Sequence, residues 1–571
     1  MKNFLNMPRR AVLPRLFGCL LLLVLLALLA HSARAQFPGT ASQTQFMCNA
    51  PGVQFGVQAF ADGAGGAYSV WIDKRGGNNS GPGTALYAQH LDANGTTLLP
   101  ANGLRLLQTR GRDIFALRAV PWQNGMLVAW IQGGFSIGGD SLRCQYFSAA
   151  GVPQWAAPTV VATRDAMVIG VAGTGFDIIP TSTGATLTYS QGIIYTGGTN
   201  FSYNRISYTG QRLLANNQMS FALPNSNYFN TVADGSDGFY VVSGSGGLGS
   251  RLFAQHYDAS GAAWANALDL TATGANGRGG QTWRAVRDPA GNLYAVWGSN
   301  SGDIIAAQVT PGGVLGWSAP GYRTLCSNPS YQSVPDALWH NNALWAVWSD
   351  DRTGQNSQTT YIQKADAAGT LAWPAAGVLV NSLPAFSPEP RLAPSDNGAV
   401  LAIYITNYSA GTGLRVQRIR PDASLAFPVN GVALHTVDPD RAFDQDLVPV
   451  AQPNGSVQVF WASLGGTSTD RNICASRMQN SGTLLGPTER AAAAVGFDVF
   501  PSPAAGELWV SLPAEHAAGP LALFDVTGRL VRHFSAAEAA QALSLRGLPP
   551  GLYMLRGQVA GQAVSRRVVV E

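Results

Sequence analysis

The feature that most constrains the fold is a phrase that recurs eight times, a short apolar strand ending on an aromatic residue. Clear copies occupy residues 67–71, 126–130, 293–297 and 344–348. Weaker copies end at Tyr189, Tyr404 and Trp461, and the copy that ends at Ser243 keeps the strand without the aromatic. Successive copies end 51 to 59 residues apart. Such a period indicates a repeat architecture, which must be recognised before single elements are assigned.

A second phrase follows the first in each repeat, a strand and then a tight turn. Residues 86–95, 252–261 and 361–369 each contain an Asp and end on a Gly three positions later. Looser copies end at Gly151, Gly210, Gly313 and Gly482, and the copy at 422–424 lacks the Gly. Such a turn joins two antiparallel strands, because Gly accepts the left-handed conformation that closes it.

Each repeat has room for four short strands, of which the aromatic-ended strand is the second. A small antiparallel sheet of this kind cannot bury both faces alone, but it can pack against its neighbours around an axis. We therefore predict an all-β fold, a β-propeller of about eight four-stranded blades over residues 36–489. The count falls to seven if the divergent copy near Ser190 is an insertion. A linear array is the alternative, and it would expose apolar faces at both ends.

Ring closure predicts that the two ends of the repeat region complete one blade, so that no sheet edge is left unpaired. Cys48 precedes the first repeat and Cys474 lies in the last. We therefore hypothesise a Cys48–Cys474 disulfide, which an oxidising compartment would permit. Cys144 and Cys326 are interpreted as buried thiols, and no pair of cysteines has metal-ligand spacing.

The first 35 residues are typical of a secretory signal peptide: a basic start, an apolar run at 20–30, and Ala33-Arg34-Ala35 before the cleavage point. No later stretch is long and apolar enough to predict a membrane span. The chain carries a net charge of +4, and the leader supplies five basic residues and no acidic ones, which leaves −1 for residues 36–571. A nearly neutral body argues against nucleic acid and anionic membranes as partners.

After a linker at 490–496, residues 497–571 alternate short strands with Gly and Pro turns and predict a small β-sandwich. Its motifs are Phe-Pro-Ser-Pro at 500–503, Leu-Trp-Val at 508–510, Leu-Phe-Asp-Val-Thr-Gly-Arg at 523–529, Leu-Pro-Pro-Gly-Leu-Tyr at 548–553 and Arg-Arg-Val-Val-Val at 566–570. In this order they resemble the C-terminal sorting domain of the type IX secretion system, with Pro-Ser-Pro where that family often has Pro-Asn-Pro. The repeat region resembles bacterial β-propellers more diffusely.

The resemblance implies export by the type IX secretion machinery, to the medium or the outer surface of a Gram-negative bacterium. It does not tell whether the domain is cleaved afterwards. The residues that carry the sorting motif are Pro501, Pro503, Asp525, Gly528, Gly551 and Tyr553. An ordinary β-sandwich with no sorting role is the alternative.

Candidate binding residues lie in the loops that follow the aromatic strands, because every blade projects this loop on the same side of the ring. Trp-x-Asp-x-Arg occurs twice. The candidate ligand-binding residues are Asp73, Arg75, Asp350, Asp351, Arg352, Asp470 and Arg471. We favour an Asp–Arg pair that fixes the strand end over a rim that binds a sugar, a peptide or Ca²⁺. We assign no catalytic residue, no metal site and no cofactor, and Ca²⁺ has no other support.

These observations indicate an exported protein whose propeller binds an extracellular ligand such as a glycan or a protein. The sequence does not identify the ligand and does not decide whether the chain is an enzyme, although we favour a role without catalysis. A propeller glycoside hydrolase or lyase with two carboxylates at the mouth of the ring is one alternative. A purely structural or adhesive surface component is the other.

Overall fold

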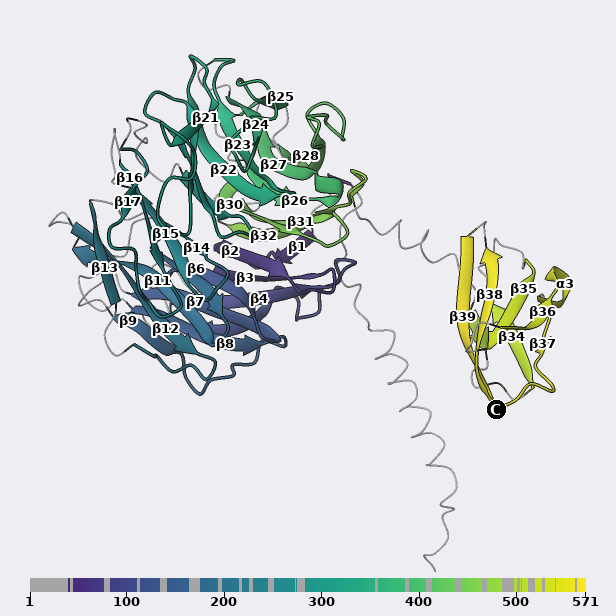
Figure 1. Cartoon of the computed structure of the whole chain (residues 1–571). Coiled ribbons are helices and arrows are strands. Elements are labelled where there is room, and N and C mark those ends of the chain that lie inside the picture. The colour runs from purple at the N-terminus through teal and green to yellow at the C-terminus, as the bar shows by residue number, and fades with distance from the viewer. Residues whose placement is uncertain are drawn as a thin grey trace, which may run out of the picture. The chain divides into compact units, whose positions relative to one another are not determined.

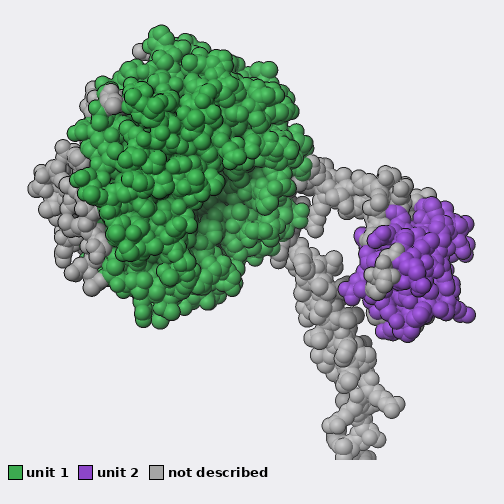
Figure 2. Space-filling view, viewed as in Figure 1, with its two compact units in different colours: residues 1–485 green, residues 486–571 purple. Residues whose placement is uncertain are grey.

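The structure is a computed structural model of the chain, which divides into two compact units, Met1–Leu485 and Gly486–Glu571 (Figures 1 and 2). It describes residues 40–41, 45–75, 83–109, 113–133, 141–163, 175–193, 198–214, 218–224, 229–244, 251–272, 274, 283–354, 358–385, 390–406, 413–436, 443–464, 470–484, 498–500, 504, 506–511, 519–525, 529–539, 541–559 and 562–571. The signal peptide expected at 1–35 and the linker expected at 490–496 lie outside these residues.

Within the described ranges, the first unit contains eight four-stranded antiparallel sheets, which we number as blades 1 to 8. Blade 1 contains β2 (Gln54–Ala61), β3 (Ala67–Asp73), β4 (Ala85–Leu91) and β5 (Leu104–Gln108). Blade 2 contains β6 (Asp113–Trp122), β7 (Gly125–Gly133), β8 (Ser141–Ser148) and β9 (Thr159–Thr163). Blade 3 contains β10 (Phe176–Thr181), β11 (Gly184–Ile193), β12 (Gly198–Ser207) and β13 (Gln218–Pro224). Blade 4 contains β14 (Phe229–Ala233), β15 (Phe239–Gly244), β16 (Leu252–Tyr257) and β17 (Leu268–Asp269).

The remaining blades follow the same order. Blade 5 contains β18 (Trp283–Arg287), β19 (Leu293–Gly298), β20 (Ile304–Val309) and β21 (Tyr322–Cys326). Blade 6 contains β22 (Gln332–His340), β23 (Ala343–Asp350), β24 (Gln358–Asp366) and β25 (Val378–Ala385). Blade 7 contains β26 (Arg391–Pro394), the short 3-10 helix η2 (Asp396–Gly398), β27 (Val400–Thr406), β28 (Gly413–Ile419) and β29 (Val432–Thr436). Blade 8 contains β30 (Phe443–Ala451), β31 (Val457–Leu464), β32 (Arg471–Met478) and β1 (Gln45–Cys48).

The blades form a ring around their first strands. The first strand of each blade lies beside the first strand of the next, and β30 of blade 8 lies beside β2 of blade 1. The space-filling view of this unit shows a hollow near its middle (Figure 2). The predicted β-propeller is therefore confirmed, and the divergent copy near Ser190 is a complete blade, so the count is eight and not seven.

The aromatic-ended phrase is the second strand of every blade. This strand pairs on both sides and packs on both faces against neighbouring blades, so it is mostly apolar. All seven residues of β3 and all eight of β23 are buried. Trp71, Trp130, Trp297, Trp348 and Trp461 are among the largest fully buried side chains.

The Gly of the second phrase makes a contact between blades. Gly369 of blade 6 has a φ of +81°, and a Cβ built on it would lie 2.9 Å from the ring of Trp317 in blade 5. The indole N–H of Trp317 donates to the carbonyl of Ala367 in the same turn at 2.9 Å. Gly313 meets Trp264 and Gly210 meets Trp155 in the same way. In these three blades the turn both closes a hairpin and receives the Trp of the preceding blade.

We expect Gly369→Ala to lower the free energy of unfolding by about 2–4 kcal/mol. A left-handed backbone costs an L-residue about 1–2 kcal/mol, and forcing a methyl against a packed ring costs about 1–3 kcal/mol more. Gly63→Ala is the control, because Gly63 has a φ of +80° and nothing within 4 Å of its Cβ position. Urea unfolding of both variants separates the two costs. Equal losses would show that the contact with Trp317 contributes nothing.

The two ends of the repeat region complete blade 8. Strand β1 pairs antiparallel with β32, so the N-terminal strand becomes the outermost strand of the last blade (Figure 1). This confirms the expected mode of closure.

The hypothesised Cys48–Cys474 disulfide is wrong, because both cysteines are free. Phe46 pairs with Cys474 and Cys48 pairs with Ile473, with a register shift between the two pairs. Cys48 joins the apolar cluster of Trp71, whereas Cys474 joins that of Trp461. The two thiols thus lie on opposite faces of one sheet, which a disulfide cannot bridge.

We expect the thiols of a chain that starts at residue 36 to be unreactive toward an aromatic disulfide reagent at pH 8 until the protein unfolds. Burial raises the pKa of Cys48 and of Cys326 to about 11, and it raises the pKa of Cys144 and Cys474 as well. The thiolate is the nucleophile, so a buried, protonated thiol does not react. Titration in denaturant should then find all four cysteines. Detection of only two free thiols would show that the other two cysteines form a disulfide.

The second unit has its own core between two sheets. One sheet contains β33 (Asp498–Phe500), β34 (Glu507–Ser511) and β37 (Leu543–Ser544). The other contains β36 (Leu530–Phe534), β35 (Leu521–Asp525), β38 (Gly551–Val559) and β39 (Gln562–Val570), and α3 (Ala536–Ala539) follows β36. Leu508 and Leu543 from the first sheet pack with Leu523 and Leu555 from the second. This confirms the predicted β-sandwich.

Across the described part of both units, no helix combines the length and the apolar character needed to cross a membrane.

Candidate functional site

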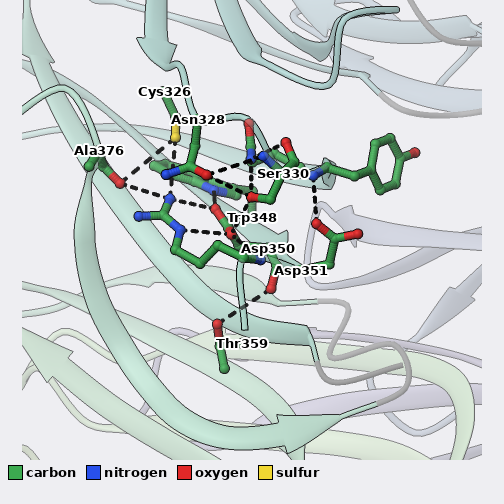
Figure 3. Close-up of polar contacts among 11 residues, drawn as sticks. Cys326, Asn328, Ser330, Trp348, Asp350, Asp351, Thr359 and Ala376 are labelled. Atoms are coloured by element: carbon green, nitrogen blue, oxygen red, sulfur yellow. Dashed lines mark hydrogen bonds and ion pairs between the residues drawn. The ribbon is translucent and has the colours of Figure 1, made fainter. Parts of the chain in front are cut away.

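The Trp-x-Asp-x-Arg phrase of blade 6 forms a buried ion pair at the end of β23. Asp350 is fully buried and accepts the indole N–H of Trp348 at 3.1 Å (Figure 3). Arg352 donates Nε to Oδ1 of Asp350 at 2.8 Å and Nη2 to Oδ2 at 2.6 Å. Both carboxylate oxygens are therefore engaged within the chain.

Further contacts hold the guanidinium of Arg352. It stacks 3.7 Å from the ring centroid of Tyr361 and donates to the carbonyl of Ala376 at 3.0 Å. Its Nη2 also lies 3.5 Å from Sγ of Cys326, which belongs to the outermost strand of the preceding blade (Figure 3). Burial lowers the pKa of Arg352, but the hydrogen bonds and charge of Asp350 outweigh it and raise the pKa above its usual range.

Blade 1 repeats this arrangement, which we call the Asp–Arg clasp. Asp73 accepts the indole N–H of Trp71 at 3.1 Å and Nε of Arg75 at 2.9 Å. Arg75 stacks 3.9 Å from the ring centroid of Tyr87 and lies 3.0 Å from Sγ of Cys48. Cys48 comes from the outermost strand of blade 8, as Cys326 comes from that of blade 5. Each clasp therefore ties a strand end to the preceding blade.

The other predicted binding residues also contact the chain itself. Asp351 accepts the backbone N–H of Tyr331 at 2.5 Å, and Asp470 accepts that of Gly52 at 3.0 Å. Arg471 forms a parallel bridge with Val53, so this pair joins blade 8 to the segment that enters blade 1. The geometry is that of residues that fix strand ends, and a ligand at these seven residues stays a prediction. Loop residues 76–82, 134–140, 194–197, 355–357 and 465–469 lie outside the described residues.

Three residues of the sorting motif are described. Asp525 accepts the backbone N–H of Arg529 at 3.1 Å and pairs with its Nε at 3.1 Å. Gly551 begins β38, and the hydroxyl of Tyr553 donates to the carbonyl of Pro549 at 2.8 Å. Pro501, Pro503 and Gly528 lie outside the described residues.

The structure brings together a set of polar residues that sequence reasoning missed. In each blade, one residue of the innermost strand pairs with the residue just before the end of the aromatic phrase. These eight residues, which we call the inner ring, are all half-buried and seven of them are polar. In blade order they are Gln58, Arg118, Asp177, Asn230, Arg284, Asp336, Arg391 and Val448.

The next level along each innermost strand is apolar. Side chains two residues apart on a strand share a face, and the residues two positions beyond the inner ring are all apolar. They are Phe60, Val120, Ile179, Val232, Val286, Leu338, Ala393 and Val450. The inner ring pairs next to the ends of the aromatic phrases, so it lies toward the side of the propeller from which the predicted binding loops leave.

The two carboxylates of the inner ring each connect three blades. Asp177 faces the charge of Arg118 in blade 2 and accepts the hydroxyl of Thr231 in blade 4 at 2.9 Å. Burial raises the pKa of Asp177 above its usual range, although Arg118 and Thr231 act in the opposite direction. Asp336 pairs with Nε of Arg284 in blade 5 at 3.3 Å and accepts the backbone N–H of Leu392 in blade 7 at 2.8 Å.

Asn230 is the inner-ring residue whose hydrogen bonding is incomplete. Its Nδ2 donates to the carbonyl of Phe229 at 3.4 Å. Its Oδ1 is buried and has no hydrogen-bond partner among the described residues. A buried acceptor without a donor is costly.

A sequence signal for the inner ring does exist. Each member lies 12 or 13 residues before the last residue of the aromatic phrase in its own repeat. An alignment of the repeats at that offset would have identified the members of the inner ring. It would not have shown which of their side chains contact one another. Among the described residues, no group of three or more His, Cys, Asp or Glu side chains is arranged to hold a metal ion.

The C-terminal segment is similar to a known protein family. Residues 498–571 match the family described as a secretion system C-terminal sorting domain. No curated protein sequence matches the chain.

Several solved structures are similar to the propeller unit in fold alone. A polysaccharide lyase, Uly1, is 10% identical, with 63% of this chain and 89% of that chain covered and a TM-score of 0.38. A PL25 ulvan lyase bound to a GlcA-Rha3S saccharide is 11% identical, with 66% and 94% covered and a TM-score of 0.40. The BP39L lectin from Burkholderia pseudomallei is 12% identical, with 65% and 97% covered and a TM-score of 0.43.

Proposed function

We propose that this exported protein, whose residues 498–571 are a type IX secretion sorting domain, uses its propeller to bind an extracellular ligand, a glycan or a protein, at the inner ring. The sorting domain indicates secretion or display at the cell surface. We further propose that the cell is Gram-negative and that the secretion machinery is the partner of the second unit. The ligand site itself rests on one observation.

That observation is the inner ring, in which seven of eight residues are polar, next to an entirely apolar level further along the same strands. Polar side chains that served only to fill space between blades would have no reason to gather at one level in seven of the eight innermost strands. Asn230 adds a buried acceptor that lacks a donor. This oxygen has almost no exposed surface, so a ligand hydroxyl or amide would supply a donor only after the side chain turns toward it.

The test is a glycan array probed with the chain from residue 36 onward, together with Asn230→Leu and Gln58→Leu. We expect retention of a subset of glycans, and a loss of about tenfold in affinity for Asn230→Leu if a ligand hydroxyl donates to it. Gln154→Leu is the matched control, because Gln154 is exposed on the turn after β8, away from the inner ring. Equal losses in the control and the ring variants would remove the inner ring as the site.

A glycoside hydrolase or lyase is the second candidate. Its support is that Asp177 and Asp336 are carboxylates at one level of the ring in different surroundings, and that burial raises the pKa of Asp177. A general acid on a sugar requires a carboxylic acid with a raised pKa, and a second carboxylate must act beside it. A polysaccharide release assay distinguishes the candidates. Turnover that is lost in Asp177→Asn or Asp336→Asn, with binding kept, favours the enzyme. Retention without turnover favours the binding protein. The absence of both retention and turnover favours a structural role.

A further inference from the structure

We propose that the second unit binds an acidic protein surface of the secretion machinery through the outer face of its four-stranded sheet. This sheet contains β36, β35, β38 and β39 (Figure 1). The proposal rests on the partner proposed above for the second unit, and it adds the binding surface and the chemistry of that partner.

Strand alternation decides which side chains form the outer face. Leu523 of β35 and Leu555 of β38 lie in the core between the two sheets. Side chains next to them on each strand therefore point away from that core. Five outward side chains are apolar: Phe524, Leu530, Leu552, Met554 and Val569.

These five side chains are neighbours across the sheet. Phe524 pairs with Leu530 on one side and with Met554 on the other, and Leu552 pairs with Val569. Leu530 is 53% exposed and Leu552 is 37% exposed, and the other three are half-buried. A contiguous exposed patch of this kind marks an interaction site.

Two exposed arginines border the apolar residues. Arg556 follows Met554 on the same face of β38, and its guanidinium lies 4.9 Å from the ring centroid of Phe524. Arg567 pairs directly with Met554. Among the described residues, neither arginine forms an ion pair.

Carboxylates are missing from the outward positions of these strands. The described outward residues of β35, β36, β38 and β39 include no Asp or Glu. Glu571 lies beyond the end of β39, and no ion pair joins it to a described arginine. Residues 497–571 contain six Arg and six acidic residues, so the positive charge of the face arises from their distribution and not from a basic domain.

The residue types favour a protein over a membrane. Aromatic residues, Met and Arg are enriched in protein interfaces, where a guanidinium binds a carboxylate in a bidentate manner. An anionic membrane attracts clusters of basic residues, which a domain with equal numbers of Arg and acidic residues does not supply. The complementary partner therefore presents carboxylates around an apolar centre.

The experiment measures export of the full chain from a bacterium that has a type IX secretion system. Immunoblots compare the medium and the cell surface with the periplasm. We expect Arg556→Glu with Arg567→Glu to lower the exported fraction about threefold or more, because it opposes the carboxylates of the partner. Arg556→Lys with Arg567→Lys keeps the charge and should be exported better than the Glu pair.

A second pair of variants tests the apolar part of the face. Leu552→Ser with Met554→Ser should also lower export about threefold or more. Trp509→Ser is the matched control, because Trp509 is 48% exposed on β34 of the other sheet, where the exposed Glu507 shares its face. Arg546→Glu is the charge control, since Arg546 is exposed after β37 and outside the proposed surface. Both controls should be exported like the unchanged chain.

Two measurements separate loss of binding from loss of folding. Thermal unfolding of each purified chain from residue 36 onward shows whether the variant is folded, and a destabilised pair is replaced by Leu552→Gln alone. A photo-crosslinking side chain at Leu552 should form an adduct with a component of the secretion machinery during export, whereas one at Trp509 should not.

Three outcomes overturn the inference. They are normal export of folded outer-face variants, equal losses in the controls, and flotation of the chain with phosphatidylglycerol vesicles that the Glu pair abolishes, which would assign the face to a membrane. Deletion of residues 486–571 tests the proposed partner separately. If the deleted chain is exported normally, the secretion machinery does not bind the second unit. If the deletion blocks export while every outer-face variant is exported, only the proposed surface is wrong.

Discussion

Asp350→Ala is expected to lower the free energy of unfolding by about 3–5 kcal/mol, because removal of one partner of a buried ion pair leaves an uncompensated charge. Asp350 is fully buried and accepts five hydrogen bonds, one from the indole of Trp348, one from the hydroxyl of Ser330 and three from the backbone N–H, Nε and Nη2 of Arg352. Without the carboxylate, the guanidinium of Arg352 would keep its contacts with Tyr361 and Ala376 but lose its counter-charge. Urea unfolding of the chain from residue 36 onward measures the loss.

The double variant Asp350→Asn, Arg352→Met is the matched control. It removes both charges and keeps the volumes similar, so we expect it to be less destabilised than Asp350→Ala. Ligand binding should be unchanged in both variants if the clasp serves only to fix the strand end. Unchanged stability of Asp350→Ala together with a loss of ligand binding would instead establish the clasp as the binding rim.

Deletion of residues 36–48 is expected to open the propeller. Burial of Met47 in strand β1 is by itself worth about 1.5–3 kcal/mol, and Cys48 packs in the same cluster. The deletion also exposes the edge of β32, and an unpaired edge is a template for aggregation. We expect a lower unfolding temperature and concentration-dependent association, measured by thermal unfolding and size-exclusion chromatography.

Two controls make this test specific to strand closure. Phe46→Ser changes a β1 side chain that is 39% exposed, so it should shift stability by no more than about 0.5 kcal/mol. A synthetic peptide of residues 40–52 should restore the unfolding temperature of the deleted chain, because it can pair with β32 in the native register. A deleted chain that remains monomeric and equally stable would show that β1 does not close the ring.

Much of the scaffold was predictable from local patterns. The second strand of each blade is central in its sheet, so its continuous apolar run appears directly in the sequence, as in β3 and β23. The turn Gly repeats because hairpin closure requires it, and in three blades a Trp of the preceding blade also packs against it. The disulfide hypothesis failed at Cys48 because a register shift in β1 decides which face a thiol occupies. No residue pattern in a four-residue strand reveals such a shift.

The candidate site was harder to predict from the sequence than the scaffold. Asp73 and Asp350 were identified from a repeated phrase. Their burial, and the contacts of Cys48 and Cys326 with the arginines of the clasps, are seen only in the tertiary structure. The members of the inner ring differ in type from blade to blade, so a search for repeated residues passes over them. Their common property is a position, opposite the end of the aromatic phrase, and not a residue type.

The amino-acid sequence alone predicted the strand order within a blade, the repeat architecture and the β-sandwich of the second unit, whereas the complete third blade in the structure decided between seven and eight blades. The predicted features depend on hydrogen bonds and apolar periodicity within stretches of about 60 residues or fewer, which are legible along the chain. The tertiary structure alone decided which side chains of different blades meet, such as Arg284 with Asp336 or Arg352 with Cys326. Those meetings depend on how each twisted sheet packs on the next, and that packing leaves no periodic trace in the order of residues.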